Sequence, residues 1–190
     1  MVQTICFNIA GKRLWFSWVL TLVLGTAAGA AKAPAFTLAD LEGKTFSLAK
    51  EVPQGPILFD FWATWCKPCI KSLGKMQKVA EEYKEKGVRV YTINIDGPRS
   101  QAKIRPFLKR HKLTMPVLLD PTNQVMKQYH LIAPPAALLV DANGDLVYSH
   151  QGYKPGGEKA WRAALDQLLK KQQQKTSPAS DRTEEKNREK

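Results

Sequence analysis

The sequence predicts an α/β sandwich with a mixed central sheet flanked by helices. A β-rich apolar run at 56–62 is followed by a helical pattern and then by a second β-rich run at 88–95. Near the C-terminal end, two further runs flank Asn143-Gly144, a dipeptide typical of a hairpin turn. Strands that first alternate with helices and later pair directly give a sheet with both parallel and antiparallel neighbours.

The first half of the domain is predicted to be a hairpin followed by a strand, a helix and a second strand. Residues 35–50 alternate around Glu42-Gly43, as in a small N-terminal β-hairpin. After the run at 56–62, apolar residues recur every three or four positions until Gly87, which predicts a helix. These helical positions are Ile70, Leu73, Met76, Val79, Ala80 and Tyr83.

The second half continues with shorter elements and a final helix. In chain order we expect a helix at 100–111, a short strand at 116–120, a short helix at 122–130, a strand pair within 136–152 and an amphipathic helix at 157–171. Pro106 is expected in the first turn of its helix or at a kink. The domain as a whole is predicted to span 34–169, and the polar extension at 170–190 is predicted to be disordered.

Residues 1–30 have the pattern of a signal peptide or an N-terminal membrane anchor. Lys12-Arg13 precedes a short apolar run, and small residues follow it up to Ala30, after which we expect cleavage. The uncharged stretch 14–31 is at the low edge of the length needed to span a bilayer, so retention as an anchor stays open. In both cases the basic residues keep the N-terminus inside, and the domain is expected to be extracytoplasmic, in the periplasm.

The composition is that of an ordinary globular protein with a strong positive charge. The 29 basic and 17 acidic residues give 29 − 17 = +12, and the pI is about 9.7. The lysines are spread along the chain and form no basic stripe interleaved with aromatic residues, so nucleic acid is not the expected partner. A basic surface attracted to acidic partners or anionic lipid is the simpler interpretation.

The cysteines indicate redox chemistry. Cys6 lies in the leader, which leaves Cys66 and Cys69 in a single C-x-x-C pair. A zinc site usually needs four ligands, and the three histidines are far apart in sequence, so no metal is expected. A disulfide that closes so short a loop removes little chain entropy, which argues against a purely structural bond.

Because the pair lies at the start of a helix, the two thiols are expected to have different roles. The helix N-terminus favours a thiolate at Cys66, which makes Cys66 the nucleophile. Cys69 lies one turn further in and is expected to resolve the mixed disulfide. The charge of Lys67 favours the Cys66 thiolate, and Pro68 suits the first helical turn. Trp65 is expected to be part of an exposed docking surface.

The residues around the two cysteines resemble those of a known family. "ILFDFWATWCKPC" resembles the active-site segment of thioredoxin-like proteins, and the leader, "FTLADLEGKTFSL" and "LVDANGDLVYSHQGY" are similar to the TlpA/ResA type of extracytoplasmic thiol–disulfide oxidoreductase. The resemblance implies a thioredoxin-like fold and reduction of partner disulfides without a further cofactor. It also implies electrons from a membrane dithiol donor of the DsbD/CcdA kind. The implied partners are apocytochrome c, a copper-site assembly protein or misoxidised secreted proteins.

The resemblance also assigns roles to two residues outside the C-x-x-C segment. It implies that Asp60 is a buried proton acceptor beneath Cys69; an ordinary strand-end aspartate bonded to backbone is the alternative. It implies that Pro135 is a cis-proline that shapes the groove for the partner's cysteine; a trans Pro-Pro turn is the alternative. Pro134 precedes it and has no N–H to offer a docked strand.

Three positions depart from the family pattern, and two other functions have to be compared with the residues present. Ser72 stands where ResA-type proteins often have glutamate, Gly74 where thioredoxin-like helices have proline, and Pro134 where relatives have an N–H donor. A copper-binding or metal-delivery module is the alternative function, although such proteins generally use C-x-x-x-C with a distant histidine. A peroxidase needs a peroxidatic cysteine with Thr and Arg near it, and the sequence shows no such set.

Overall fold

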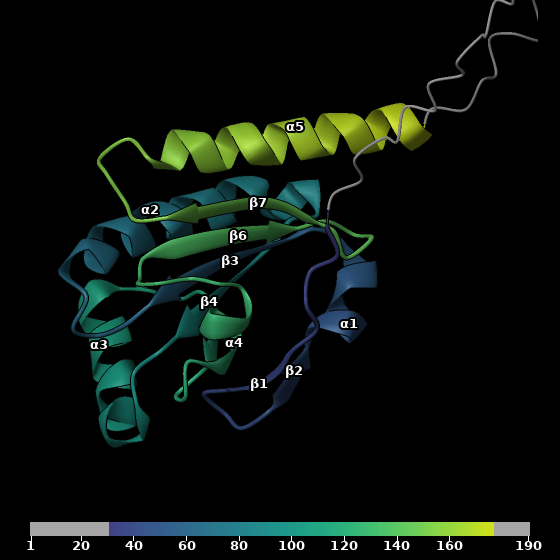
Figure 1. The fold of residues 1–190 in the computed structure, drawn as a ribbon. Helices are drawn as coiled ribbons and strands as arrows, with labels where there is room; N and C mark the ends of the chain where they lie inside the picture. Colours follow the sequence, from purple (N-terminus) through teal and green to yellow (C-terminus); the bar gives the residue numbers. More distant parts are fainter. Residues whose placement is uncertain (1–30, 177–190) are drawn as a thin grey trace, which may run out of the picture.

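The protein forms one mixed β-sheet with helices on both faces (Figure 1). The computed structural model describes residues 31–176, and the strand order in this part of the chain is β2-β1-β5-β4-β3-β6-β7. Strand β3 pairs parallel with β4 and antiparallel with β6. The expected α/β class with a mixed sheet is therefore confirmed.

The elements follow the predicted order. The strands are β1 (Thr37–Asp40), β2 (Thr45–Ser47), β3 (Ile57–Trp62), β4 (Arg89–Asn94), β5 (Val117–Leu119), β6 (Ala136–Val140) and β7 (Leu146–Gln151). The helices are α1 (Leu48–Glu51), α2 (Lys67–Tyr83), α3 (Ile104–His111), α4 (Gln124–Gln128) and α5 (Glu158–Thr176). Short 3₁₀ turns occupy Val52–Gln54, Lys84–Lys86 and Pro98–Lys103.

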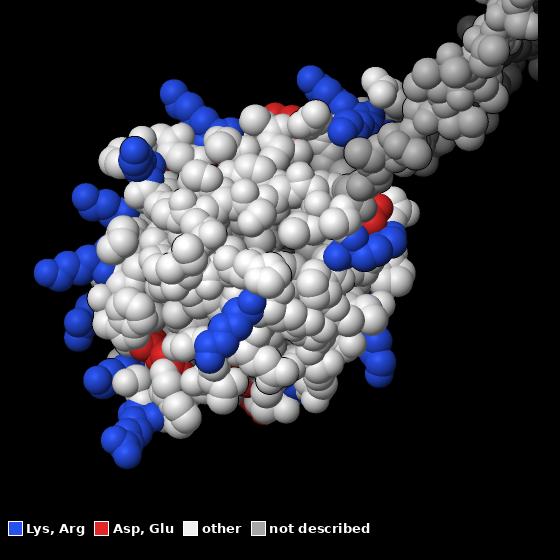
Figure 2. Space-filling model, in the orientation of Figure 1, with Lys and Arg blue, Asp and Glu red and all other residues white. Residues whose placement is uncertain are grey.

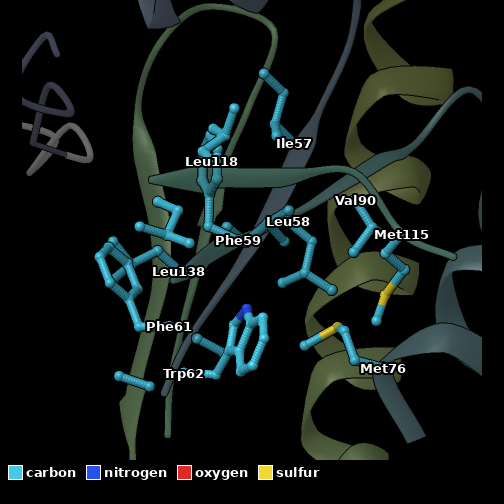
Figure 3. Close-up of a cluster of buried hydrophobic side chains, with 14 of the residues drawn as sticks. Ile57, Leu58, Phe59, Phe61, Trp62, Met76, Val90, Met115, Leu118 and Leu138 are labelled. Carbon is cyan, nitrogen blue, oxygen red and sulfur yellow. The ribbon is translucent and has the colours of Figure 1, made fainter. Parts of the chain in front are cut away.

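Strand β3 is the centre of the core. All six of its residues are buried, because strands flank both of its edges and helices or loops cover both of its faces. Its side chains alternate, so Leu58 and Trp62 point to one side of the sheet and Phe59 and Phe61 to the other (Figure 3). On the first side Met76 of α2 lies beside Trp62. The sequence of β3 is apolar throughout because neither of its faces meets water.

The opposite side of the sheet is filled by a cluster of aromatic rings. Phe59 makes edge contacts with Phe36 and Phe46, at centroid distances of 5.5 and 6.0 Å. Tyr91 and Tyr129 extend the cluster to β4 and to the end of α4. The N-terminal hairpin and the residue before it therefore close this side of the core.

Helix α5 packs against α2 and extends further than predicted. Tyr83 donates a hydrogen bond to the Asp166 carboxylate at 2.8 Å, and Arg162 pairs with Glu82 at 2.8 Å. The helix continues to Thr176, so the prediction of a disordered extension was wrong for 170–176. Lysine and glutamine are good helix formers, and they extend a helix that is already established by the packed part of α5.

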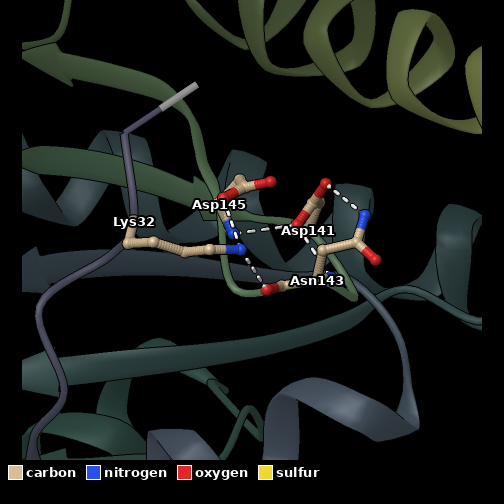
Figure 4. Close-up of polar contacts among 4 residues, drawn as sticks. All are labelled: Lys32, Asp141, Asn143 and Asp145. Carbon is tan, nitrogen blue, oxygen red and sulfur yellow. Dashed lines mark hydrogen bonds and ion pairs between the residues drawn. The ribbon is translucent and has the colours of Figure 1, made fainter. Parts of the chain in front are cut away.

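A short clip ties the start of the described chain to the β6–β7 turn (Figure 4). Lys32 pairs with Asp145 at 2.8 Å and donates to the Asn143 carbonyl at 2.9 Å. Asp141 holds the turn itself, because its carboxylate accepts the backbone N–H groups of Asn143 and Asp145. Val140 is paired with Ile57, so this clip lies at the amino end of β3.

Two local features differ from the sequence prediction. The α1 turn at Leu48–Glu51 was not predicted, and the expected helix at 100–111 begins as a 3₁₀ turn before α3 starts at Ile104. Pro106 lies in the first turn of α3, where its missing N–H has no intrahelical partner.

The leader at 1–30 lies outside the described residues. Within 31–176 no helix is long and apolar enough to cross a bilayer.

We expect Gly74→Ala to stabilise the fold by about 1 kcal/mol, because alanine is the better helix former. Gly74 is exposed within α2, and a Cβ there would meet nothing within 4 Å. Gly87→Ala is the matched contrast: Gly87 has φ +77°, and we expect a loss of about 1 kcal/mol or more. Urea unfolding measures both changes. A destabilised Gly74→Ala variant would contradict the prediction.

Candidate active site

The two cysteines lie where strand β3 passes into helix α2. Cys66 is the N-cap residue of α2, and the backbone N–H of Cys69 points at its sulfur, at 3.3 Å. The two residues form a disulfide, with their Cα atoms 5.3 Å apart. Cys66 retains 4% exposure and Cys69 has none. The structure therefore places Cys66 at the helix N-terminus and Cys69 further inside, as the sequence predicts.

This geometry favours attack by Cys66 once the disulfide is reduced. The unpaired N–H groups at the start of α2 and the positive end of the helix dipole stabilise negative charge at the N-cap position. The Cys69 N–H is already directed at the Cys66 sulfur. Lys67 is exposed in the first turn, and Pro68 lies at one of the first two helical positions, where a missing N–H costs nothing.

A buried polar cluster, which the sequence analysis missed, fixes the loop before Cys66. Both the N–H and the hydroxyl of Thr64 donate to the Asp96 carboxylate, each at 2.9 Å. The Asn94 amide donates to the same carboxylate at 2.8 Å. Both Asn94 and Asp96 are fully buried. Two polar residues, Asn94 at the end of β4 and Asp96 just beyond it, were the available signal.

Asp60 is a buried carboxylate without a partner. It lies inside β3 between Thr92 and Ala137, it has no exposure, and neither of its oxygens has a hydrogen-bond partner in the described chain. Burial raises the pKa of this carboxyl well above the ordinary value for aspartate. By alternation Asp60 faces the same side of the sheet as Leu58 and Trp62, which is the side that α2 covers. The alternative of an aspartate bonded to backbone is therefore wrong.

The peptide bond between Pro134 and Pro135 is cis, as the resemblance implies. The Pro135 carbonyl accepts the Gly152 N–H at 2.7 Å, which ties the start of β6 to the end of β7. The Ile132 N–H donates to the Gln151 side chain at 2.7 Å. These two bonds hold the segment 131–135, which we name the Pro134 loop, against the sheet.

The Pro134 loop and Trp65 form an exposed apolar surface. Trp65 is 65% exposed and Ile132 is 88% exposed, although both are large apolar side chains. A groove of about 230 Å³ lies between them, and Ala133 and Pro134 line it. The structure thus brings Trp65 and Pro134 together as the sequence predicts, while the contribution of Ile132 was missed. Exposed apolar surface of this kind is typical of protein-binding sites.

Three further residues, Ser72, Trp62 and His111, have packing roles. The buried Ser72 hydroxyl donates to the Cys69 carbonyl at 3.1 Å, so it is satisfied within α2. Trp62 is fully buried and stacks on Phe107 at 5.0 Å. His111 in turn contacts Phe107 at 4.5 Å. Within residues 31–176 no three His, Cys, Asp or Glu side chains are grouped so that they could hold a metal ion.

The comparisons with known proteins agree with one another on the family to which the chain belongs. Residues 30–149 match the AhpC/TSA family. The chain is 30% identical over 176 residues to the thiol–disulfide oxidoreductase ResA of Bacillus cereus, covering 84% of this chain and 96% of that protein. It is 29% identical over 148 residues to the sporulation thiol–disulfide oxidoreductase A of Bacillus subtilis, covering 75% of this chain and 84% of the relative.

Solved structures agree with this result. A candidate thiol:disulfide interchange protein DsbE from Chlorobium tepidum superimposes with a TM-score of 0.67 at 29% identity, over 74% of this chain and 96% of that one. A thioredoxin-like protein from Porphyromonas gingivalis gives 0.61 at 34% identity, over 72% and 91%. These neighbours confirm the thioredoxin-like fold.

We expect Asp60→Asn to remove a pH-dependent loss of stability. Because burial favours the neutral acid, the folded protein keeps a proton that the unfolded chain releases near pH 4. The contribution of Asp60 to stability is therefore fully present below that pH and is lost as the pH rises towards the pKa of Asp60 in the folded protein. In urea titrations of the oxidised proteins, the variant should be more stable than the wild type at pH 8, by a margin that shrinks towards pH 4. An equal difference at both pH values would contradict this.

Proposed function

Since the chain belongs to the AhpC/TSA family and is a thiol–disulfide oxidoreductase of the ResA type, we propose that it reduces disulfides in partner proteins. The observation that supports this most directly is the position of Cys66. Its sulfur is at the N-terminus of α2, and the exposed Trp65 directly precedes it in the chain. A thiol stabilised as a thiolate beside a protein-binding surface is suited to attack another protein's disulfide.

The proposed reaction moves two electrons in two exchange steps. The Cys66 thiolate attacks one sulfur of the partner disulfide; a Cys66–partner bond forms, and the partner's other sulfur leaves as a thiolate. The Cys69 thiolate then attacks the Cys66 sulfur. The Cys66–Cys69 disulfide forms, the second partner sulfur is released, and the partner takes up two protons overall.

Asp60 is proposed to accept the proton of Cys69 through water in the second step. Cys69 is fully buried, and a buried thiol is a poor nucleophile until it loses its proton. The unpartnered Asp60 carboxyl is on the side of the sheet covered by α2, and its raised pKa lets it hold that proton.

The leader and the resemblance support the cellular setting that we propose. We place the domain outside the inner membrane, as a cleaved or membrane-anchored protein, with a DsbD/CcdA-type dithiol donor reducing Cys66–Cys69 after each cycle. No cofactor beyond this disulfide enters the proposed reaction. Apocytochrome c, a copper-site assembly protein and misoxidised secreted proteins are the proposed substrates.

We expect the reduced protein to transfer electrons to a disulfide-bonded peptide, and Cys66→Ser to abolish this transfer. Cys69→Ser should instead accumulate a mixed disulfide, because the resolving thiol is absent. Mass spectrometry separates the two outcomes, and the same variant expressed in cells identifies the trapped partners. Equilibration with glutathione gives the potential. A value near that of a strong oxidant, about −120 mV, would overturn the reducing direction.

We also expect Pro134→Thr to tighten the docking of an extended partner segment. Proline offers no N–H to a strand lying along the Pro134 loop, and threonine restores this donor. In the Cys69→Ser background, the trapped complex of Pro134→Thr should resist release by dithiothreitol several-fold longer. Pro98→Thr, at an exposed position outside this groove, is the control. An unchanged release rate for Pro134→Thr would refute the role of the missing N–H.

A further inference from the structure

A second groove is also lined by Trp65, and it shares no other lining residue with the groove beside the Pro134 loop. It opens between the segment before Cys66 and the region of α3, and its volume is about 500 Å³. We name it the α3 groove. Its apolar surface comes from Trp65, Ala102, Pro106 and Phe107, and its charges come from Lys103 and Arg110. Trp65 therefore lines both grooves, and it directly precedes Cys66 in the chain.

The walls of the α3 groove are fixed before any partner binds. Phe107 stacks on the fully buried Trp62. Thr64 on one wall is bonded to the Asp96 carboxylate, and Gln101 beside the other wall donates to the Asp96 carbonyl at 2.9 Å. A preformed site loses little conformational entropy when a ligand enters it.

The charge of the α3 groove is positive and uncompensated. Lys103 and Arg110 are exposed and form no ion pair in the described chain, whereas Arg105, which lies in α3 with Arg110, pairs with Glu42 at 3.1 Å. Asp96 is fully buried beneath Thr64 and is occupied by its own donors. Figure 2 shows basic side chains projecting along the edge of the molecule where α2 and α3 lie in Figure 1.

We propose that the α3 groove binds an acidic segment of the partner protein, with Asp or Glu beside an apolar side chain, next to the partner's reactive disulfide. This rests on the proposed function, because the partner's cysteine must reach Cys66. Trp65 adjoins Cys66, and each extended residue spans about 3.3 Å, so the flanking residues of a docked segment reach the groove. The apolar side chain covers Trp65 and Phe107, while the carboxylates face Lys103 and Arg110. Charge complementarity of this kind raises the association rate and fixes the orientation of the partner.

The test compares three disulfides reduced by the full-length dithiol protein at low ionic strength. Two are synthetic peptides with one internal disulfide, flanked by Leu with either three Glu or three Lys; the third is hydroxyethyl disulfide. Lys103→Glu/Arg110→Glu reverses the groove charge. Lys50→Glu/Lys84→Glu makes the same change in net charge at exposed positions outside the groove. Ala102→Trp fills the groove without altering its charge.

We expect the rate constant for the acidic peptide to be at least ten times that for the basic peptide. The two rate constants should approach each other as salt is added. The groove reversal should lower the acidic-peptide rate about tenfold and leave the hydroxyethyl disulfide rate unchanged. Ala102→Trp should lower the acidic-peptide rate several-fold, and the control reversal should change it less than twofold.

Equal wild-type rates for the two peptides, or an equal loss in the control reversal, would overturn the proposal. So would a groove reversal that abolishes sedimentation with anionic phospholipid vesicles but spares the acidic-peptide rate, because the groove would then serve a membrane surface. If none of the three disulfides is reduced, the proposed function itself fails, and the groove proposal fails with it.

Discussion

The burial of strand β3 is the constraint on which the rest of the structure depends. Neighbouring strands pair with both of its edges, and packing on both sides of the sheet leaves none of its six residues exposed. Because β3 is held so firmly, the point at which it ends is fixed, and so is the start of α2. The position of Cys66 at the helix N-cap follows from this. The same burial leaves the Asp60 carboxyl with no exposed surface and raises its pKa, so the packing that holds the strand leading to Cys66 also produces the unusual acid within that strand.

The sheet and the redox pair could be read from the sequence because their signals are local. The apolar periodicity predicted α2, and Asn143-Gly144 predicted the hairpin of β6 and β7. The C-x-x-C spacing after an apolar strand predicted the redox-active disulfide. The cis peptide before Pro135 came from the resemblance. Each of these depends on residues that are close in sequence or on a motif with few structural solutions.

What the sequence did not reveal depends on residues that meet only in the fold. Thr64 and Asp96 are 32 residues apart, and no sequence pattern around either residue indicates that they form a hydrogen bond. The exposure of Ile132 depends on how the Pro134 loop is tied to β7. The helical end of the chain was underestimated for another reason. Residues 170–176 bury no apolar side chain that a periodicity could detect, and their helix continues from the packed part of α5.

The clip between Lys32 and the β6–β7 turn determines which end of the domain lies next to the leader. The clip is at the amino end of β3 and the disulfide follows its carboxyl end, so about 20 Å of strand separates the two. Figure 1 shows both ends of the described chain leaving on the same side. If the leader anchors the chain, as proposed above, the clipped end of the domain is the end next to the anchor, and the thiols lie beyond the other end of β3. In that proposed setting soluble substrates reach the thiols directly, whereas the proposed membrane dithiol donor needs a domain of its own that extends to them.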